Sequence, residues 1–94
     1  MDLKKLQQAK LKMATKVVGT DTVLVPLKGN VADLDVMFTL NEVGTFVWDE
    51  LTSAESTDEL VTRVLEEFEI DKNTAKQDVL AFLAELEGFV GKVL

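Results

Sequence analysis

The spacing of apolar residues changes from strand-like to helical within residues 34–51, and no loop separates the two patterns. Over 34–40 every second residue is apolar, which is typical of a strand with one buried face. From residue 43 the apolar residues follow helical spacing and are Val43, Phe46, Val47 and Leu51. Asn41 lies at the change and is a preferred N-cap, with Glu42 beside the positive end of the helix dipole. The pattern predicts a strand over 34–40 that is joined directly to a helix over 42–52.

The preceding sequence predicts two more strands. Residues 11–18 alternate in the same way, and Gly19-Thr20-Asp21 supplies turn residues. Residues 22–25 then form a returning strand, which we expect Pro26 to end. A second turn at Gly29-Asn30 leads to the strand at 34–40. The expected sheet is antiparallel and three-stranded, with one face free to receive helices.

Two further helices are expected after residue 52. The first begins at Ser56 with a capping box that includes Glu59, and its apolar face ends at Phe68. The second begins near Asp71 and is expected to end at Gly88 in a left-handed cap, followed by a short apolar tail over 89–94. The prediction is therefore one α+β domain over 1–94, a small three-stranded antiparallel sheet followed by three helices, like a winged helix-turn-helix.

The charge of the chain is unevenly distributed. The 94 residues carry a net charge of −7, yet residues 1–16 contain five lysines against Asp2 alone. We interpret residues 1–10 as a flexible, solvated basic arm, with a nucleic-acid or partner tail as the alternative. The chain has no apolar run long enough to cross a bilayer, and its first residues do not resemble a signal peptide. We therefore expect a cytoplasmic protein that does not bind membranes.

Candidate catalytic chemistry is sparse. The sequence has no histidine, cysteine or tyrosine, which excludes His-dependent nucleophilic catalysis, thiolate chemistry and imidazole or thiolate metal sites. Adjacent acids such as Asp49/Glu50 and Glu66/Glu67 lie on predicted polar helix faces, which lack the apolar pocket that a catalytic carboxylate pair requires. The glycines do not form a phosphate-binding or dinucleotide-binding loop. We expect no catalytic residues, no cofactor and no metal, so the chain is not predicted to be an enzyme.

Two binding functions remain. The strand at 34–40 is short and lies at a sheet edge in this prediction, so an extended peptide can add to it as another strand. Leu80 lies off the core stripe of the last helix, where it either borders a peptide groove or contacts the sheet or the tail. The alternative is a winged-helix transcriptional regulator that binds DNA. Its recognition helix is expected to be basic, whereas 72–87 has two lysines and three acids.

Three segments in this order resemble the PqqD family, the pyrroloquinoline quinone (PQQ) synthesis protein D and its relatives. They are LNEVGTFVW at 40–48, STDELVTRVLEEFEID at 56–71 and DVLAFLAELEGFV at 78–90, preceded by VLVPLKG at 23–29. The resemblance covers about residues 11–94. The segment GNVADLDVM at 29–37 is longer than in the PQQ protein itself, which implies a relative that serves another peptide.

The resemblance implies a non-catalytic peptide chaperone, a recognition element for ribosomally made, post-translationally modified peptides. Such a domain binds the leader of a precursor peptide and presents it to a radical S-adenosylmethionine (SAM) enzyme. The leader lies as an added strand against the third strand and the third helix. The peptide-binding residues that this implies are Asp35, Val36, Met37, Phe38 and Thr39 on the strand, with Lys76, Leu80, Leu83 and Glu87 on the helix. A homodimer that exchanges N-terminal strands is left open.

Overall fold

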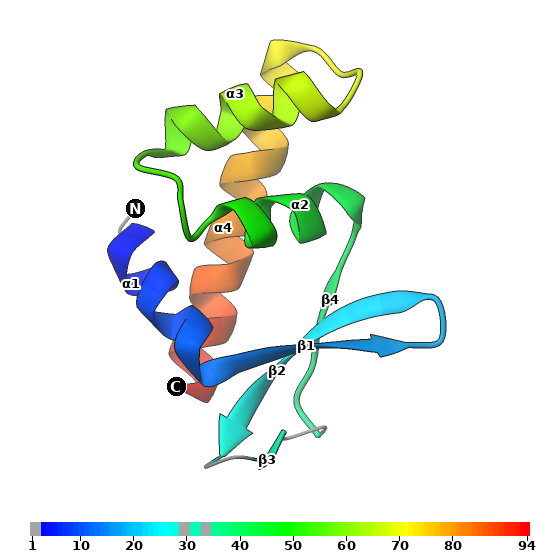
Figure 1. The fold of residues 1–94 in the computed structure, drawn as a ribbon, viewed down its shortest axis with the longest axis vertical. Coiled ribbons are helices and arrows are strands. Elements are labelled where there is room, and N and C mark those ends of the chain that lie inside the picture. The colour runs from blue at the N-terminus through cyan, green and yellow to red at the C-terminus, as the bar shows by residue number, and fades with distance from the viewer. Residues whose placement is uncertain (1–2, 29–30, 33–34) are drawn as a thin grey trace.

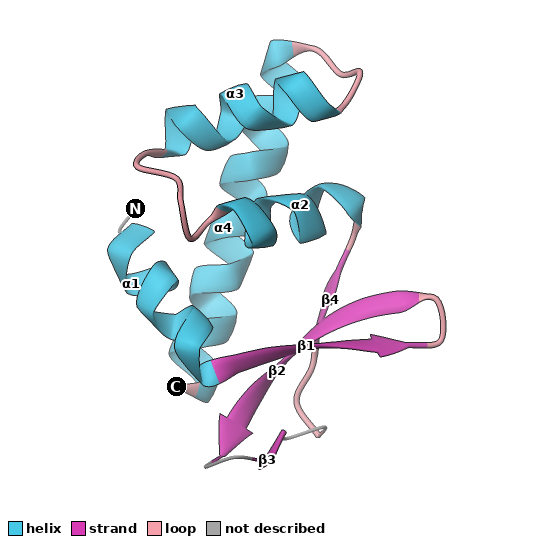
Figure 2. Ribbon diagram, viewed as in Figure 1, coloured by secondary structure: helices cyan, strands magenta, loops and turns pink. Residues whose placement is uncertain are grey.

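The computed structural model describes residues 3–28, 31–32 and 35–94 and has an α+β fold (Figure 1). The elements in chain order are α1 (Leu3–Ala9), a 3-10 turn η1 (Lys10–Lys12), β1 (Met13–Val18), β2 (Asp21–Lys28), β3 (Val31–Ala32), β4 (Phe38–Leu40), α2 (Glu42–Glu50), α3 (Thr57–Glu67) and α4 (Lys72–Val93). Figure 2 shows the strands on one side of the molecule and the helices on the other. The predicted fold class is confirmed, although one helix precedes the sheet.

The sheet is built around β2. β1 pairs with β2 as an antiparallel hairpin, and Gly19 in its turn has a φ of 64°, the left-handed conformation that glycine adopts without steric cost. β3 and β4 both pair with β2 on the side away from β1. Pro26 does not end β2, because the strand continues to Lys28 and Pro26 lies within it, opposite Met13 of β1.

The third predicted strand is divided in two and is shorter than expected. β3 pairs Ala32 with Leu27, whereas β4 pairs Phe38 with Leu24. From Leu27 to Leu24 is three residues along β2, whereas from Ala32 to Phe38 is six residues along the paired chain. The segment between β3 and β4 is therefore three residues longer than a continuous antiparallel ladder would need. Asp35–Met37 accordingly form a turn and bend rather than a strand. Leu34, which begins the predicted strand, lies outside the described residues.

Polar side chains cap the helices as the sequence predicts. The Ser56 hydroxyl accepts a hydrogen bond from the Glu59 amide at 3.1 Å, and Glu59 accepts one from the Glu55 amide at 2.7 Å. Asp71 accepts hydrogen bonds from the amide and the hydroxyl of Thr74 at 2.8 and 3.0 Å. These bonds stabilise the carboxylates, and they hold the pKa values of Glu59 and Asp71 below the ordinary carboxyl range.

The end of α4 differs from the prediction. Gly88 is not a left-handed cap, since α4 continues through it to Val93 and, among the described glycines, a positive φ occurs at Gly19. The predicted apolar tail is therefore the last part of α4. Its Val90 packs in the core, where a helical continuation buries apolar surface that a free tail exposes.

The N-terminal segment is helical from residue 3 rather than a flexible arm. α1 buries Leu6 and Ala9 in the core. The Gln7 side-chain amide donates to the carbonyls of Leu51 and Ala54 at 2.8 and 2.9 Å, just beyond the end of α2. The last carbonyls of a helix have no hydrogen-bond donors within the helix. Gln7 supplies such donors to Leu51 and Ala54, which follow α2.

Lys10 makes a second link between the N-terminal segment and α2. Its Nζ donates to the Trp48 carbonyl at 2.6 Å and lies 4.9 Å from the centroid of the Trp48 ring. Burial lowers the pKa of Lys10, and the nearby Asp49 carboxylate acts in the opposite direction. Part of the basic N-terminal charge is therefore used to hold α1 and η1 against α2.

One apolar cluster joins the helices to the sheet. The sheet contributes Met13, Leu24 and Leu40, and α4 contributes the largest share of buried residues. Trp48 belongs to this cluster and is almost fully buried. In the part of the chain that the structure describes, no helix is both long and apolar enough to cross a membrane.

Candidate functional site

The junction between β4 and α2 consists of the single residue Asn41. Its backbone is extended, and its side-chain oxygen accepts a hydrogen bond from the Gly44 amide at 2.7 Å. Its carbonyl accepts hydrogen bonds from the amide and the hydroxyl of Thr45 at 2.8 and 2.9 Å. The predicted strand-to-helix change without a loop is confirmed, and it fixes the direction of β4 relative to α2.

Aromatic contacts hold β4 against α4. The Phe38 ring packs edge-on to Phe82, with centroids 6.1 Å apart, and lies 5.3 Å from Phe89. Phe82 also contacts the first turn of α2, where a Cβ on Gly44 would lie 3.1 Å from the ring. Gly44 therefore permits the close approach of α4 to the junction.

A small cleft of about 140 Å³ lies where β4, the start of α2 and α4 meet. Its apolar lining comes from Phe38, Leu40, Val43, Gly44, Ala81 and Phe82, and its polar lining from Thr39, Asn41, Asp78 and Glu85. Asp78, Ala81, Phe82 and Glu85 are spaced i, i+3, i+4 and i+7, so they form one stripe along α4. We call these four residues the cleft stripe.

The outer edge of β4 borders this cleft. Among the described strands, β4 pairs with β2 alone, so its other side has no strand partner. An unpaired strand edge presents amide donors and carbonyl acceptors that a further strand can use. Cleft and edge together can bind an extended chain through backbone hydrogen bonds and one inserted side chain.

The structure brings only part of the predicted strand residues to the cleft. Phe38 and Thr39 line it, whereas Asp35, Val36 and Met37 precede β4 in the turn and bend. Met37 is half exposed and Asp35 is exposed, so both are accessible at the start of the edge.

The predicted helix residues lie elsewhere on α4. Lys76, Leu80 and Glu87 do not line the cleft, and a repeat of about 100° per residue places them on roughly the opposite flank from the cleft stripe. Leu80 is 40% exposed, so it is not a core residue. Leu83 has no exposed surface and supports the helix from within the core.

Sequence reasoning missed the cleft stripe, although one signal pointed to it. Phe82 and Phe89 are seven residues apart on α4, so they lie on one face together with Asp78 and Glu85. An apolar strand residue such as Phe38 packs against the face that carries these rings. The paired phenylalanines thus mark the side of α4 that faces β4.

The acidic side chains at this cleft are few and come from α4. No group of three or more acidic, histidine or cysteine side chains among them is arranged to hold a metal ion. The charged groups that line the cleft are two exposed carboxylates on one helix face.

Comparisons with known proteins bear on the family and the fold of the chain. Among curated proteins, no sequence matches the chain. The solved structure of "TbiB1 in Complex with the TbiA(beta) Leader Peptide" matches with a TM-score of 0.61 and 23% sequence identity, over 82% of this chain and 84% of that chain, and so shows the same fold. The family model described as coenzyme PQQ synthesis protein D (PqqD) matches residues 21–88. Since this match covers more than half of the chain, the protein belongs to the PqqD family.

Proposed function

We propose that this protein is a non-catalytic adaptor that binds the leader of a ribosomally made precursor peptide. The leader adds as a strand to the outer edge of β4 and places one apolar side chain in the cleft beside α4. The adaptor then presents the precursor to a maturation enzyme, for which a radical SAM enzyme is our candidate. The observation that carries the proposal is the unpaired edge of β4 beside the cleft. Family membership supports it, as does the shared fold with a protein solved in complex with a leader peptide.

The binding residues that we propose differ from the sequence prediction on the helix. Phe38 and Thr39 remain, with Asp35–Met37 as the approach to the edge. On α4 we propose that the peptide contacts the cleft stripe instead of Lys76, Leu80 and Glu87. The cleft stripe lines the cleft beside β4, and those three residues do not. Leu83 acts from the core and makes no peptide contact.

The geometry sets how such a peptide gains affinity. Each backbone hydrogen bond contributes about 0.5–1.5 kcal/mol net, and β4 has three residues. Strand pairing alone therefore gives weak binding, and the apolar anchor in the cleft must supply the rest. Because Asn41 and the packed rings fix β4 against α4, the groove is formed before binding, which reduces the entropy lost on association.

A pair of matched substitutions on α4 tests this proposal. In Ala81→Arg, the long side chain lies between Asp78 and Glu85 and fills the cleft, so we expect peptide affinity to fall at least tenfold, or about 1.4 kcal/mol. Ala84→Arg is the control, since Ala84 is exposed on the same helix but does not line the cleft. Fluorescence anisotropy with labelled leaders from short reading frames beside the gene measures both. Equal affinity of the two variants for a bound leader contradicts the proposed site.

The charge of the cleft does not favour the DNA-binding alternative. The charged residues of the cleft are acidic, and acidic surface repels the phosphate backbone. A gel shift at low salt tests this directly, and we expect no shift of random duplex DNA.

A further inference from the structure

The charged residues that line the cleft beside β4 are both acidic. A second hollow lies at the other end of this strand, beside the β1–β2 turn, and its charged lining residues are Asp21 and Glu42. It shares the lining residues Leu40 and Asn41 with the cleft, so the two hollows are neighbours, and we call them together the trough. All charged residues that line this trough are acidic, and they are Asp21, Glu42, Asp78 and Glu85.

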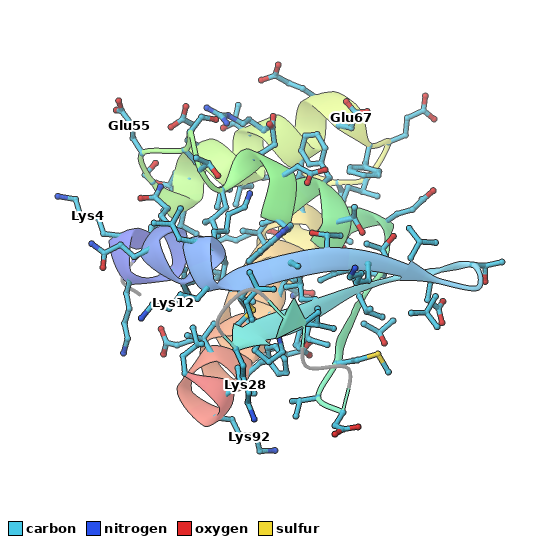
Figure 3. All side chains as sticks on the ribbon, turned by 60° about the horizontal axis from the view of Figure 1, so that its bottom comes forward. Lys4, Lys12, Lys28, Glu55, Glu67 and Lys92 are labelled. Atoms are coloured by element: carbon cyan, nitrogen blue, oxygen red, sulfur yellow. The ribbon has the colours of Figure 1, made fainter. Side chains whose placement is uncertain are left out.

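The net charge of the protein does not by itself explain this lining. A third hollow, between α1, η1 and the end of α4, has two charged lining residues, Lys5 and Lys12. Figure 3 shows Lys28 and Lys92 at one end of the molecule and Glu55 and Glu67 at the other. The sign of charge therefore varies from one hollow to another, and the trough at β4 is acidic as a local property.

We propose that the trough at β4 selects leader segments in which an apolar anchor is flanked by lysine or arginine side chains. This inference rests on the proposed function and names the class of peptide that the site takes. An anchor enters the cleft beside Ala81 and Phe82, and cations on either side meet carboxylates at the rim. Acidic leaders encounter like charges at each of these positions and bind more weakly.

The spacing of the carboxylates sets the expected spacing of the cations. Asp78 and Glu85 are seven residues apart on α4, a rise of about 10 Å along the helix. An extended peptide covers this distance in about three residues. In Figure 1, β4 and α4 both run along the long axis of the molecule, so a strand added to β4 passes along the cleft stripe. Because side chains of an extended peptide alternate between its two faces, groups that all face α4 stand at alternate positions. We therefore expect two cations four residues apart, with the apolar anchor midway between them.

A displayed library of random 12-residue peptides tests the inference on the full chain without knowledge of the natural leader. Peptides that bind the unmodified protein and the Ala84→Arg control but not Ala81→Arg report on the cleft, because both variants add the same charge to α4. We expect them to be enriched in Lys and Arg around an apolar residue. We also expect Asp78→Asn/Glu85→Gln to weaken the selected peptides by about 2- to 30-fold, the range for two exposed ion pairs. Glu66→Gln/Glu67→Gln on α3 removes the same charge outside the trough and is expected to leave affinity unchanged.

The outcomes separate the charge inference from the proposed function. Cleft-dependent peptides without a bias toward cations, or affinities that the Asp78/Glu85 variant does not change, overturn the charge inference and leave strand addition in place. If no recovered peptide binds the unmodified protein more tightly than Ala81→Arg, the proposed site is overturned, and the charge inference with it. Weaker binding in 0.5 M salt than in 50 mM salt is a further expected result, because salt screens exposed ion pairs.

Discussion

At the scale of single residues, the junction depends on a glycine that two neighbours crowd. A Cβ on Gly44 would lie 3.1 Å from the Asn41 side-chain oxygen and 3.1 Å from the Phe82 ring. Both neighbours have fixed roles, since Asn41 caps α2 and Phe82 is buried beside β4. Gly44 thus leaves room for the Asn41 cap and for the Phe82 ring at the same point.

Gly44→Ala is therefore expected to lower the free energy of unfolding by about 1 kcal/mol. The methyl group displaces the cap or the ring, and this cost exceeds the gain in helix propensity. Gly91→Ala is the matched control, because Gly91 also lies in a helix but a Cβ there meets no atom within 4 Å. It is expected to raise the free energy of unfolding by up to about 1 kcal/mol. Urea titrations of both variants measure the difference, and a Gly44→Ala protein that gains as much stability as Gly91→Ala contradicts this account.

At the scale of elements, side-chain hydrogen bonds attach α1 and η1 to the end of α2. Gln7 donates to two carbonyls there, and Lys10 donates to a third. Gln7→Ala leaves partly buried carbonyls without a donor, which costs about 1–3 kcal/mol. The exposed neighbour Gln8 provides the control Gln8→Ala. Urea unfolding followed by the fluorescence of Trp48 measures both, and equal midpoints contradict the proposed attachment.

The elements also show which parts of the fold local sequence determines. Side-chain caps at Asn41, Ser56 and Asp71 act within one helical turn, so the three helix starts were predictable and are confirmed. The division of the third strand into β3 and β4 was not predictable from local sequence, because it depends on how each part pairs with β2. The first residues of the chain form α1 only because tertiary contacts bury Leu6 and Ala9, and a seven-residue helix has little stability alone.

The candidate site illustrates the same limit. Helical periodicity separates the buried stripe of α4 from its two exposed flanks, and it placed Leu80 correctly outside the core. Periodicity does not determine which flank faces β4, because that depends on how the helix crosses the sheet. The contact of Phe38 with Phe82 and Phe89 settles the question in favour of the cleft stripe. The strand half of the site was thus partly predictable, and the helix half required the tertiary structure.

At the scale of the whole molecule, the surfaces are divided by charge and by accessibility. The acidic trough follows β4, while the hollow between α1 and α4 is lined by lysines. An added strand at β4 extends the sheet without displacing the core, because the residues that border the edge are already packed on α4. The proposed strand addition is therefore expected to need no rearrangement of the core.

Intermolecular nuclear Overhauser effects between isotope-labelled protein and an unlabelled bound peptide test strand addition most directly. We use a peptide recovered from the library or a leader that binds in the anisotropy assay. The account predicts cross-strand contacts between the peptide backbone and Phe38–Leu40, together with side-chain contacts to Ala81 and Phe82. Contacts to β1 or to the hollow between α1 and α4, with the β4 amide signals unmoved, would contradict it.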